Sequence, residues 1–278
     1  MGPVTAAEDL HWVRPEGGRG TGVLVLAGSS GRLDIGRAQA LGDAGATALA
    51  LRWFGGVGQP AVPCEVPLET FVHALDLLAP ECDRLAVLGL SYGAEAALLT
   101  AVRDPRIRAV VALAPSDVAW EGYCADDADP PRSKWTWRGD PVPFVPLDRS
   151  WVPADDLPAF APHYQRSRDV AGPSIVEAAT IPVEEIQADL VLVAGGDDQV
   201  WPSVAAARAI EARRARRGLE TVVIEDARAG HPVVLPGEPA PDPSRRYRVG
   251  GDAGAPQRVG ERAWPAICGV LRLRPTGS

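Results

Sequence analysis

Six short runs of apolar, mostly small or branched residues recur along the chain, and each is typical of a β-strand buried on both faces. These runs are residues 22–27, 46–51, 85–90, 110–114, 189–194 and 221–224. Apolar residues at helical spacing predict helices at 68–78, 92–102 and 203–217. Strands and helices that alternate in this way form βαβ units, whose helices cover both faces of a mostly parallel sheet. We therefore expect a single, doubly wound α/β domain over residues 1–278.

The alternation is interrupted once, between about residues 115 and 182. This segment contains eleven of the 27 prolines and half of the eight tryptophans, namely Trp120, Trp135, Trp137 and Trp151. Prolines at this density prevent long helices and central strands, and long irregular segments of compact domains are usually functional. We expect an irregular cap over the active edge of the sheet, with Trp120, Trp135 and Trp137 in contact with substrate.

The net charge of -8 narrows the choice of partners. Nucleic acids and anionic membranes are bound through a basic face, so this balance disfavours both. No uncharged apolar run approaches the roughly 20 residues that span a bilayer, and residues 1–9 show neither the basic nor the apolar region of a secretory signal. We expect a cytoplasmic protein that acts on a small molecule.

Four cysteines, Cys64, Cys82, Cys124 and Cys268, lie far apart in the sequence. They show none of the short paired spacings of zinc sites, and a chain of this length can bury a large core without disulfides. We therefore expect four reduced cysteines that pack in the interior, and no metal site.

Residues 89–93 read Gly-Leu-Ser-Tyr-Gly and match the pattern G-x-S-x-G between a predicted strand and a predicted helix. A sharp strand-to-helix turn needs glycines on both sides of the serine, because Cβ atoms there would clash with the crossing backbone. Such a turn presents the Ser91 hydroxyl above the sheet edge as a nucleophile. The alternative is an ordinary glycine-rich βα turn.

A serine hydroxyl needs a base to remove its proton, and the chain has four histidines. His11 is near the N-terminus, His73 lies within the predicted helix 68–78, and His163 is in the proline-rich segment. His231 follows the last predicted strand, where the carboxyl edge of the sheet would place it near Ser91. His231 is therefore the candidate base.

The base in turn needs a carboxylate that orients its ring. Asp197 and Asp198 follow the strand before the histidine, which gives the chain order Ser, Asp, His of α/β-hydrolases. We favour Asp198 and expect Asp197 to cap or brace the turn. Asp117 and Asp226 are weaker alternatives, the latter because it is too close to His231 in sequence to turn back on it easily.

Backbone N–H groups must stabilise the negative charge of the transition state. One is expected from Tyr92, directly after the nucleophile, and the other from Ser29 in the small-residue loop 27–31. This loop lacks both G-x-G-x-x-G and a lysine, so we expect no nucleotide or other cofactor.

With these residues in place, the chain resembles the C-terminal catalytic domain of the acyl-CoA thioesterase and bile acid-CoA:amino acid N-acyltransferase family, a group of dienelactone-hydrolase-like α/β-hydrolases. The motifs that carry the resemblance are residues 26–31 (LAGSSG), 50–55 (ALRWFG), 89–95 (GLSYGAE), 133–137 (SKWTW), 181–184 (IPVE), 195–198 (GGDD) and 229–231 (AGH). The resemblance implies Ser91 as nucleophile, Asp198 as acid and His231 as base, with activated acyl substrates such as acyl-CoA. Arg32 departs from the family pattern, since a glycine is common at this place.

The hypothesis from these residues is acyl transfer through an acyl-Ser91 intermediate, with an acyl-CoA or related thioester as substrate. The same triad would serve a carboxylesterase or a lactone hydrolase, and a cap that excludes water would favour N-acyl transfer to an amine. A ligand-binding protein that keeps the hydrolase fold is the non-enzymatic alternative.

Arginines could recognise the phosphates of coenzyme A. Two clusters, residues 208–217 and Arg245, Arg246 and Arg248, are better explained as solvated charged faces. Lys134 and Arg138 of the proline-rich segment are somewhat better placed for such a role, but they too are more readily explained without a ligand.

Overall fold

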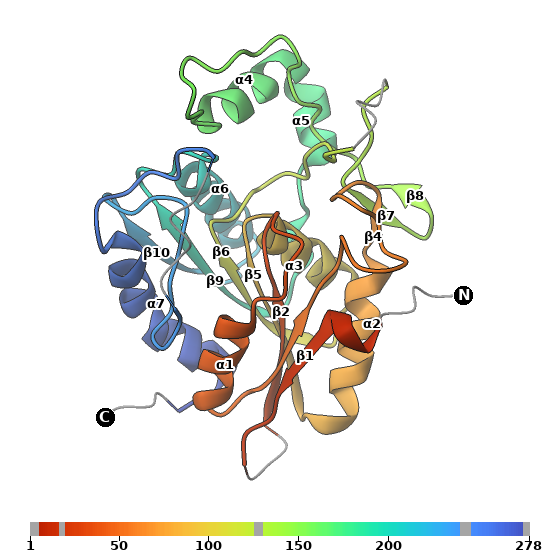
Figure 1. The fold of residues 1–278 in the computed structure, drawn as a ribbon, viewed down its shortest axis with the longest axis vertical. Coiled ribbons are helices and arrows are strands. Elements are labelled where there is room, and N and C mark those ends of the chain that lie inside the picture. The colour runs from red at the N-terminus through yellow and green to blue at the C-terminus, as the bar shows by residue number, and fades with distance from the viewer. Residues whose placement is uncertain (1–5, 17–19, 125–129, 240–245, 275–278) are drawn as a thin grey trace.

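A computed structural model describes residues 6–16, 20–124, 130–239 and 246–274 (Figure 1). Within them, a seven-stranded sheet has the order β1-β3-β2-β5-β6-β9-β10. Its strands are β1 (Leu10–Val13), β2 (Thr21–Leu26), β3 (Thr47–Leu51), β5 (Arg84–Leu90), β6 (Ile107–Leu113), β9 (Asp189–Gly195) and β10 (Val222–Asp226). The six predicted strands are all present and pair in parallel, while β1 pairs antiparallel with β3 at the edge. The prediction of an α/β fold with a mostly parallel sheet is confirmed.

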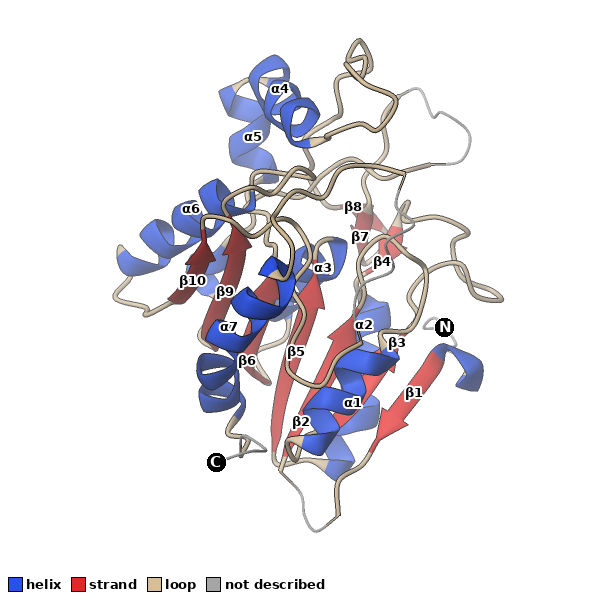
Figure 2. Ribbon diagram, turned by 60° about the vertical axis from the view of Figure 1, so that its left-hand side comes forward, coloured by secondary structure: helices blue, strands red, loops and turns tan. Residues whose placement is uncertain are grey.

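Helices cover both faces of this sheet (Figure 2). They are α1 (Ile35–Asp43), α2 (Glu69–Leu78), α3 (Tyr92–Arg103), α6 (Ser203–Ala215) and α7 (Ala255–Leu271). Because side chains alternate along a strand, β2 sends Leu24 and Leu26 into the core under α2, α3 and α6, and Val23 and Val25 into the core under α1 and α7. The α2, α3 and α6 helices were all expected from the hydrophobic spacing.

The segment from 115 to 182, called the insertion below, lies beyond the carboxyl ends of the strands (Figure 1). It is more regular than its prolines suggested: β7 (Trp135–Trp137) and β8 (Asp140–Pro141) form a small sheet with β4 (Val66–Pro67), and α4 (Ala161–Ala171) and α5 (Pro173–Ala179) follow. Short 3-10 helices complete the described elements at Ala7–Asp9, Ala79–Glu81 and Val183–Glu185. The prolines of the insertion thus limit its strands and helices to short lengths rather than preventing them.

A disulfide between Cys64 and Cys124 contradicts the expectation of four reduced cysteines. The N–H of Tyr123 donates to the carbonyl of Pro63 at 3.0 Å, and this pairing brings the Cα atoms of the two cysteines to 5.1 Å, a normal separation for a disulfide. The prediction failed because 60 residues separate the two in sequence. Cys82 and Cys268 are buried thiols outside the disulfide, as expected, and burial raises the pKa of Cys268 to about 11.

Candidate active site

Ser91 lies at a sharp turn between β5 and α3. Its backbone adopts φ 59° and ψ -119°, a region that non-glycine residues rarely enter and that costs energy to hold. The Ser91 N–H donates to Leu113 O of the neighbouring strand at 2.9 Å. A Cβ on Gly89 would lie 2.0 Å from the carbonyl oxygen of Gly93, and one on Gly93 would lie 2.4 Å from that of Leu26. The close backbone crossing predicted for a nucleophile elbow is therefore present.

His231 and Asp198 are in contact at the carboxyl edge of the sheet, beyond strands β9 and β10. The Nδ1 atom of His231 lies 2.9 Å and 3.0 Å from the two carboxylate oxygens of Asp198, and both side chains are buried. The same carboxylate accepts the N–H groups of Val200 and Trp201 at 2.9 Å and 3.2 Å, which fix its orientation. Because Nδ1 is engaged by the acid, Nε2 is the ring nitrogen left to exchange a proton.

The other aspartates considered have different partners. Asp197 accepts the side-chain amide of Gln199 at 2.6 Å and the N–H of Gly251 at 2.8 Å, so it braces the turn as expected. Asp117 forms an ion pair with Arg168 at 2.7 Å.

The remaining histidines lie elsewhere. His163 of α4 contacts the carbonyl of Asp148 at 3.0 Å and stacks on Trp151; burial lowers its pKa. His73 contacts the carbonyl of Glu69 within α2, and His11 belongs to the edge strand β1.

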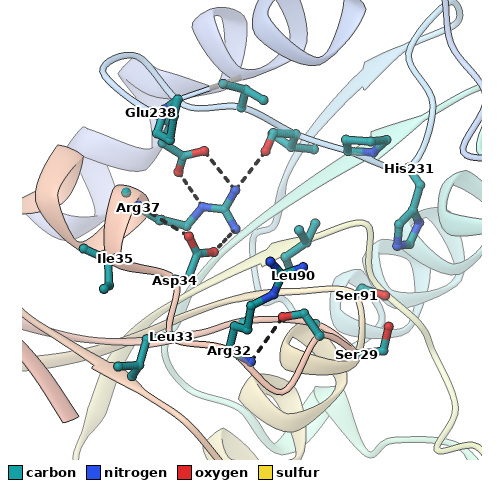
Figure 3. A pocket seen from close by; sticks show the side chains of 18 of the residues that line it. Ser29, Arg32, Leu33, Asp34, Ile35, Arg37, Leu90, Ser91, His231 and Glu238 are labelled. Carbon is teal, nitrogen blue, oxygen red and sulfur yellow. Dashed lines mark hydrogen bonds and ion pairs between the residues drawn. The ribbon is translucent and has the colours of Figure 1, made fainter. Parts of the chain in front are cut away.

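Ser91 and His231 line one cavity of about 730 Å³ (Figure 3). Its other walls come from the loop after β2, the start of α1 and the chain that follows His231. Gly28 of that loop lies directly against the nucleophile, since a Cβ there would be 3.2 Å from the Cβ of Ser91. Ser29 comes next and lies beside Ser91 in Figure 3. Tyr92 is the first residue of α3, so its N–H has no intrahelical acceptor.

The three tryptophans predicted to contact substrate do not line this cavity. Trp135 is fully buried, donates its ring N–H to Glu95 at 2.6 Å and packs on Trp53. Trp120 is 2% exposed and donates to the hydroxyl of Ser116. Trp137 is half-buried against an arginine of α3. Among the described residues no part of the insertion lines the cavity. Trp120 and Trp135 belong to the core, where their polar N–H groups find buried acceptors.

Sequence reasoning missed a buried ion pair behind the elbow. Glu95 of α3 and Lys134 are both completely buried, and Nζ of Lys134 lies 2.8 Å from Glu95 Oε2. That ammonium also lies 3.4 Å from the centre of the Tyr92 ring, and the other oxygen of Glu95 accepts the N–H of Trp120. Lys134 therefore cannot bind a substrate phosphate in this conformation. The signal was in the sequence, because this sole lysine directly precedes Trp135 and Trp137, and Glu95 interrupts an alanine-rich helix.

A serine elbow after β5, an aspartate after β9 and a histidine after β10, on a mostly parallel sheet, define the α/β-hydrolase class. The profile of the BAAT / acyl-CoA thioester hydrolase C-terminal family matches residues 66–266. The chain belongs to this family, as the sequence motifs implied.

Solved structures share the fold at low identity. A puromycin-hydrolyzing peptidase of Mycobacterium tuberculosis is 16% identical with a TM-score of 0.56, over 95% of this chain and 36% of its own. An acylaminoacyl peptidase of Pyrococcus horikoshii is 10% identical with a TM-score of 0.54, over 97% and 40%. A dienelactone hydrolase-like promiscuous phosphotriesterase from metagenomic libraries is 19% identical with a TM-score of 0.50, over 95% and 90%. No curated protein sequence matches significantly.

Two kinds of feature are absent from the described residues. They contain no group of three or more His, Cys, Asp or Glu side chains placed to hold a metal ion. None of their helices is long and apolar enough to pass through a bilayer.

Proposed function

We propose that this protein is a serine hydrolase that transfers an acyl group first to Ser91 and then to water. The observation that carries the proposal is the contact between His231 and Asp198, at 2.9 Å, beside a cavity that Ser91 also lines. A nucleophile, a base and an acid that orients the base are the three groups that acyl transfer needs.

Each residue has a defined part in the reaction. Nε2 of His231 takes the hydroxyl proton as Ser91 Oγ attacks the carbonyl carbon, and Asp198 stabilises the resulting imidazolium. The N–H groups of Tyr92 and Ser29 stabilise the negative charge on the substrate oxygen. The bond to the leaving group then breaks, and His231 gives up its proton to the leaving group or, where this departs as a thiolate, to solvent. The neutral ring next takes a proton from the water that attacks the acyl-Ser91 ester, and returns it to Ser91 Oγ as the acid is released.

The substrate we propose is an acyl-CoA or a related thioester. Membership of the acyl-CoA thioester hydrolase family supports this choice. A thiol with a pKa of about 8.5 leaves readily as the thiolate and makes little demand on the acid. Exposed residues such as Ser29 and Ser30 line the cavity, so water can reach the acyl-enzyme. This favours hydrolysis over transfer to an amine.

Thiol release from acyl-CoA tests the proposal directly. We expect Ser91→Ala to lower kcat by about 10⁴-fold or more with an unchanged circular dichroism spectrum. The exposed Ser150→Ala variant, outside the cavity, serves as the matched control. A fluorophosphonate probe should label wild type and the control but not Ser91→Ala. Undiminished turnover in Ser91→Ala would refute the assignment, and failure of the probe to label wild type would favour a ligand-binding protein.

A further inference from the structure

Two arginines line the same cavity as Ser91 and His231 without a carboxylate partner. Arg32 lies on the loop after β2, three residues beyond Ser29, and Arg246 lies on the chain that follows the histidine. Both are exposed, and within the described residues neither forms an ion pair. Figure 3 shows the Arg32 side chain directed along the cavity toward Leu90.

The acidic side chains of the cavity are already engaged. Arg37 is buried and lies 2.9 Å from Asp34 and 2.5 Å from Glu238. The Arg37 backbone N–H also donates to Asp34, and that of Leu235 donates to Glu238. These contacts leave the two carboxylates satisfied, so they do not compete for the guanidinium groups of the free arginines.

The other described arginines of the two clusters noted in the sequence do not line this cavity, and several of them form ion pairs. Arg208 pairs with Glu225 at 2.6 Å, and Arg248 pairs with Asp155 at 3.0 Å. Arg245 lies outside the described residues. Arg32 and Arg246 thus supply local positive charge in the cavity of Ser91. In a chain of net charge -8, an approaching anion gains attraction only from such local positive charge.

We propose that Arg32 and Arg246 form an anion-binding subsite, and that the substrate carries a carboxylate or a phosphate besides the carbonyl that is attacked. A guanidinium binds either group through two parallel charge-assisted hydrogen bonds. The proposal rests on the proposed function, because it concerns the substrate of the same site.

Two matched pairs of thioesters show on which side of the scissile bond the anion lies. Adipoyl-pantetheine and its neutral monomethyl ester differ by one carboxylate on the acyl side. Hexanoyl-CoA and hexanoyl-pantetheine differ by the 3′-phosphorylated ADP group on the leaving-group side, which carries the phosphates; the arginine variants below separate the effect of its charge from that of its adenosine. We expect the anionic member of one pair to have about tenfold higher kcat/KM, in line with a hydrogen bond to a charged group.

The variants Arg32→Gln and Arg246→Gln should each reduce this anionic-to-neutral ratio of kcat/KM by about fivefold or more. Added salt should lower the same ratio in the wild-type protein, because it screens the attraction. Arg216→Gln removes the same charge from an exposed arginine at the end of α6, and its ratio should equal that of wild type. A ratio near one in both pairs, or equal ratios in all four proteins, overturns the subsite.

Binding to the Ser91→Ala protein separates the subsite from the catalytic proposal. Calorimetric titration of this protein with adipoyl-pantetheine, hexanoyl-CoA and their neutral counterparts should show that one of the two anionic thioesters binds more tightly than its counterpart. This difference in affinity should disappear in the double variant Ser91→Ala/Arg32→Gln. If wild type hydrolyses no thioester but this difference is found, the proposed function fails and the subsite stands. If hydrolysis occurs without charge preference, the subsite fails alone.

Discussion

Asp197 and Asp198 are chemically identical neighbours, but their surroundings give the two carboxylates different partners and different roles. At the end of β9 the chain turns so that one carboxylate points toward His231 and the other toward the N–H of Gly251. The turn is tight: a Cβ on Gly195 would lie 2.1 Å from the carbonyl oxygen of Gly230. The end of strand β9 and the loop that carries His231 are thus held in close backbone contact, and this contact sets the direction of each aspartate side chain.

Asp198→Asn should therefore lower kcat for thioester hydrolysis by about 10³–10⁴-fold, because an amide favours the wrong tautomer of His231 and cannot stabilise the imidazolium. Asp197→Asn is the neighbouring control and should cost less than about tenfold in kcat, since it only braces the turn. Steady-state kinetics of both variants measure the difference. Equal losses in the two variants would show that the acid is not Asp198 alone.

Asp9 is a second residue whose surroundings decide its charge. It is fully buried, its carboxylate oxygens accept no hydrogen bond within the described residues, and Arg52 lies 3.6 Å away. Burial raises the pKa of this carboxyl despite the attraction of Arg52. The folded protein therefore binds the proton more tightly than the unfolded chain, and this contribution to stability is lost as pH rises through the folded-state pKa.

We expect Asp9→Asn to raise Tm at pH 7 to 8, because the amide avoids burying a charge. The gain should shrink toward pH 4, where the carboxyl of wild type is protonated as well. Differential scanning calorimetry across this range tests the sign. The exposed Asp156→Asn variant should show no such trend, and a gain that is independent of pH would contradict the explanation.

At the scale of elements, the buried pair of Glu95 and Lys134, the residue before β7, joins the insertion to helix α3 of the elbow. It sits among the rings of Tyr92 and Trp135, where water cannot replace a lost partner. Tyr92 also meets the insertion at α4, through a hydroxyl contact of 3.0 Å with Tyr164. The insertion is therefore anchored to the helix that carries the nucleophile rather than suspended above it.

Removing one partner of the pair should be costly. Lys134→Ala is expected to lower the free energy of unfolding by about 3–5 kcal/mol, because the Glu95 carboxylate would stay buried without its counter-charge. The matched control is the exposed pair of Arg106 and Asp76, where Asp76→Asn should cost less than about 1 kcal/mol. Urea unfolding measures both. Similar small costs would mean that water enters the Glu95 site.

Sequence patterns were informative for elements with strong periodicity and weak elsewhere. The buried strands and the helix of the elbow follow directly from apolar runs and glycine spacing. The strand β1 was missed because Leu10–Val13 is a half-exposed edge strand with no buried run to reveal it. The helix α4 was missed because only two of its residues, Tyr164 and Ser167, are buried, so its apolar positions are too few to show a period.

At the scale of the molecule, some parts of the candidate site could likewise be predicted from the sequence and others could not. The residues of the triad could be proposed because each follows a strand at one edge, and parallel strands bring these ends together. The roles of Trp120 and Trp135 could not, because burial and substrate contact both favour large aromatic rings, and only the position of Glu95 shows which applies.

The disulfide ties the loop before β4 to the insertion across 60 residues of chain. Its loss in Cys64→Ser/Cys124→Ser should lower the free energy of unfolding by about 2–4 kcal/mol, as expected for a cross-link that restricts the unfolded chain. Dithiothreitol should shift wild type to the same value and leave the double variant unaffected. A shift of both proteins, or of neither, would contradict a stabilising bond at this place.

Lys134 is the sole lysine of the chain and its side chain is completely inaccessible. An amine-directed reagent such as an N-hydroxysuccinimide ester therefore meets no reactive lysine while β7 stays on α3. Acylation of Lys134, followed over time by peptide mass spectrometry, would report the rate at which that junction first opens. Lys134, which the sequence suggested for phosphate binding, thus serves instead as a chemical probe for the opening of the region behind the nucleophile.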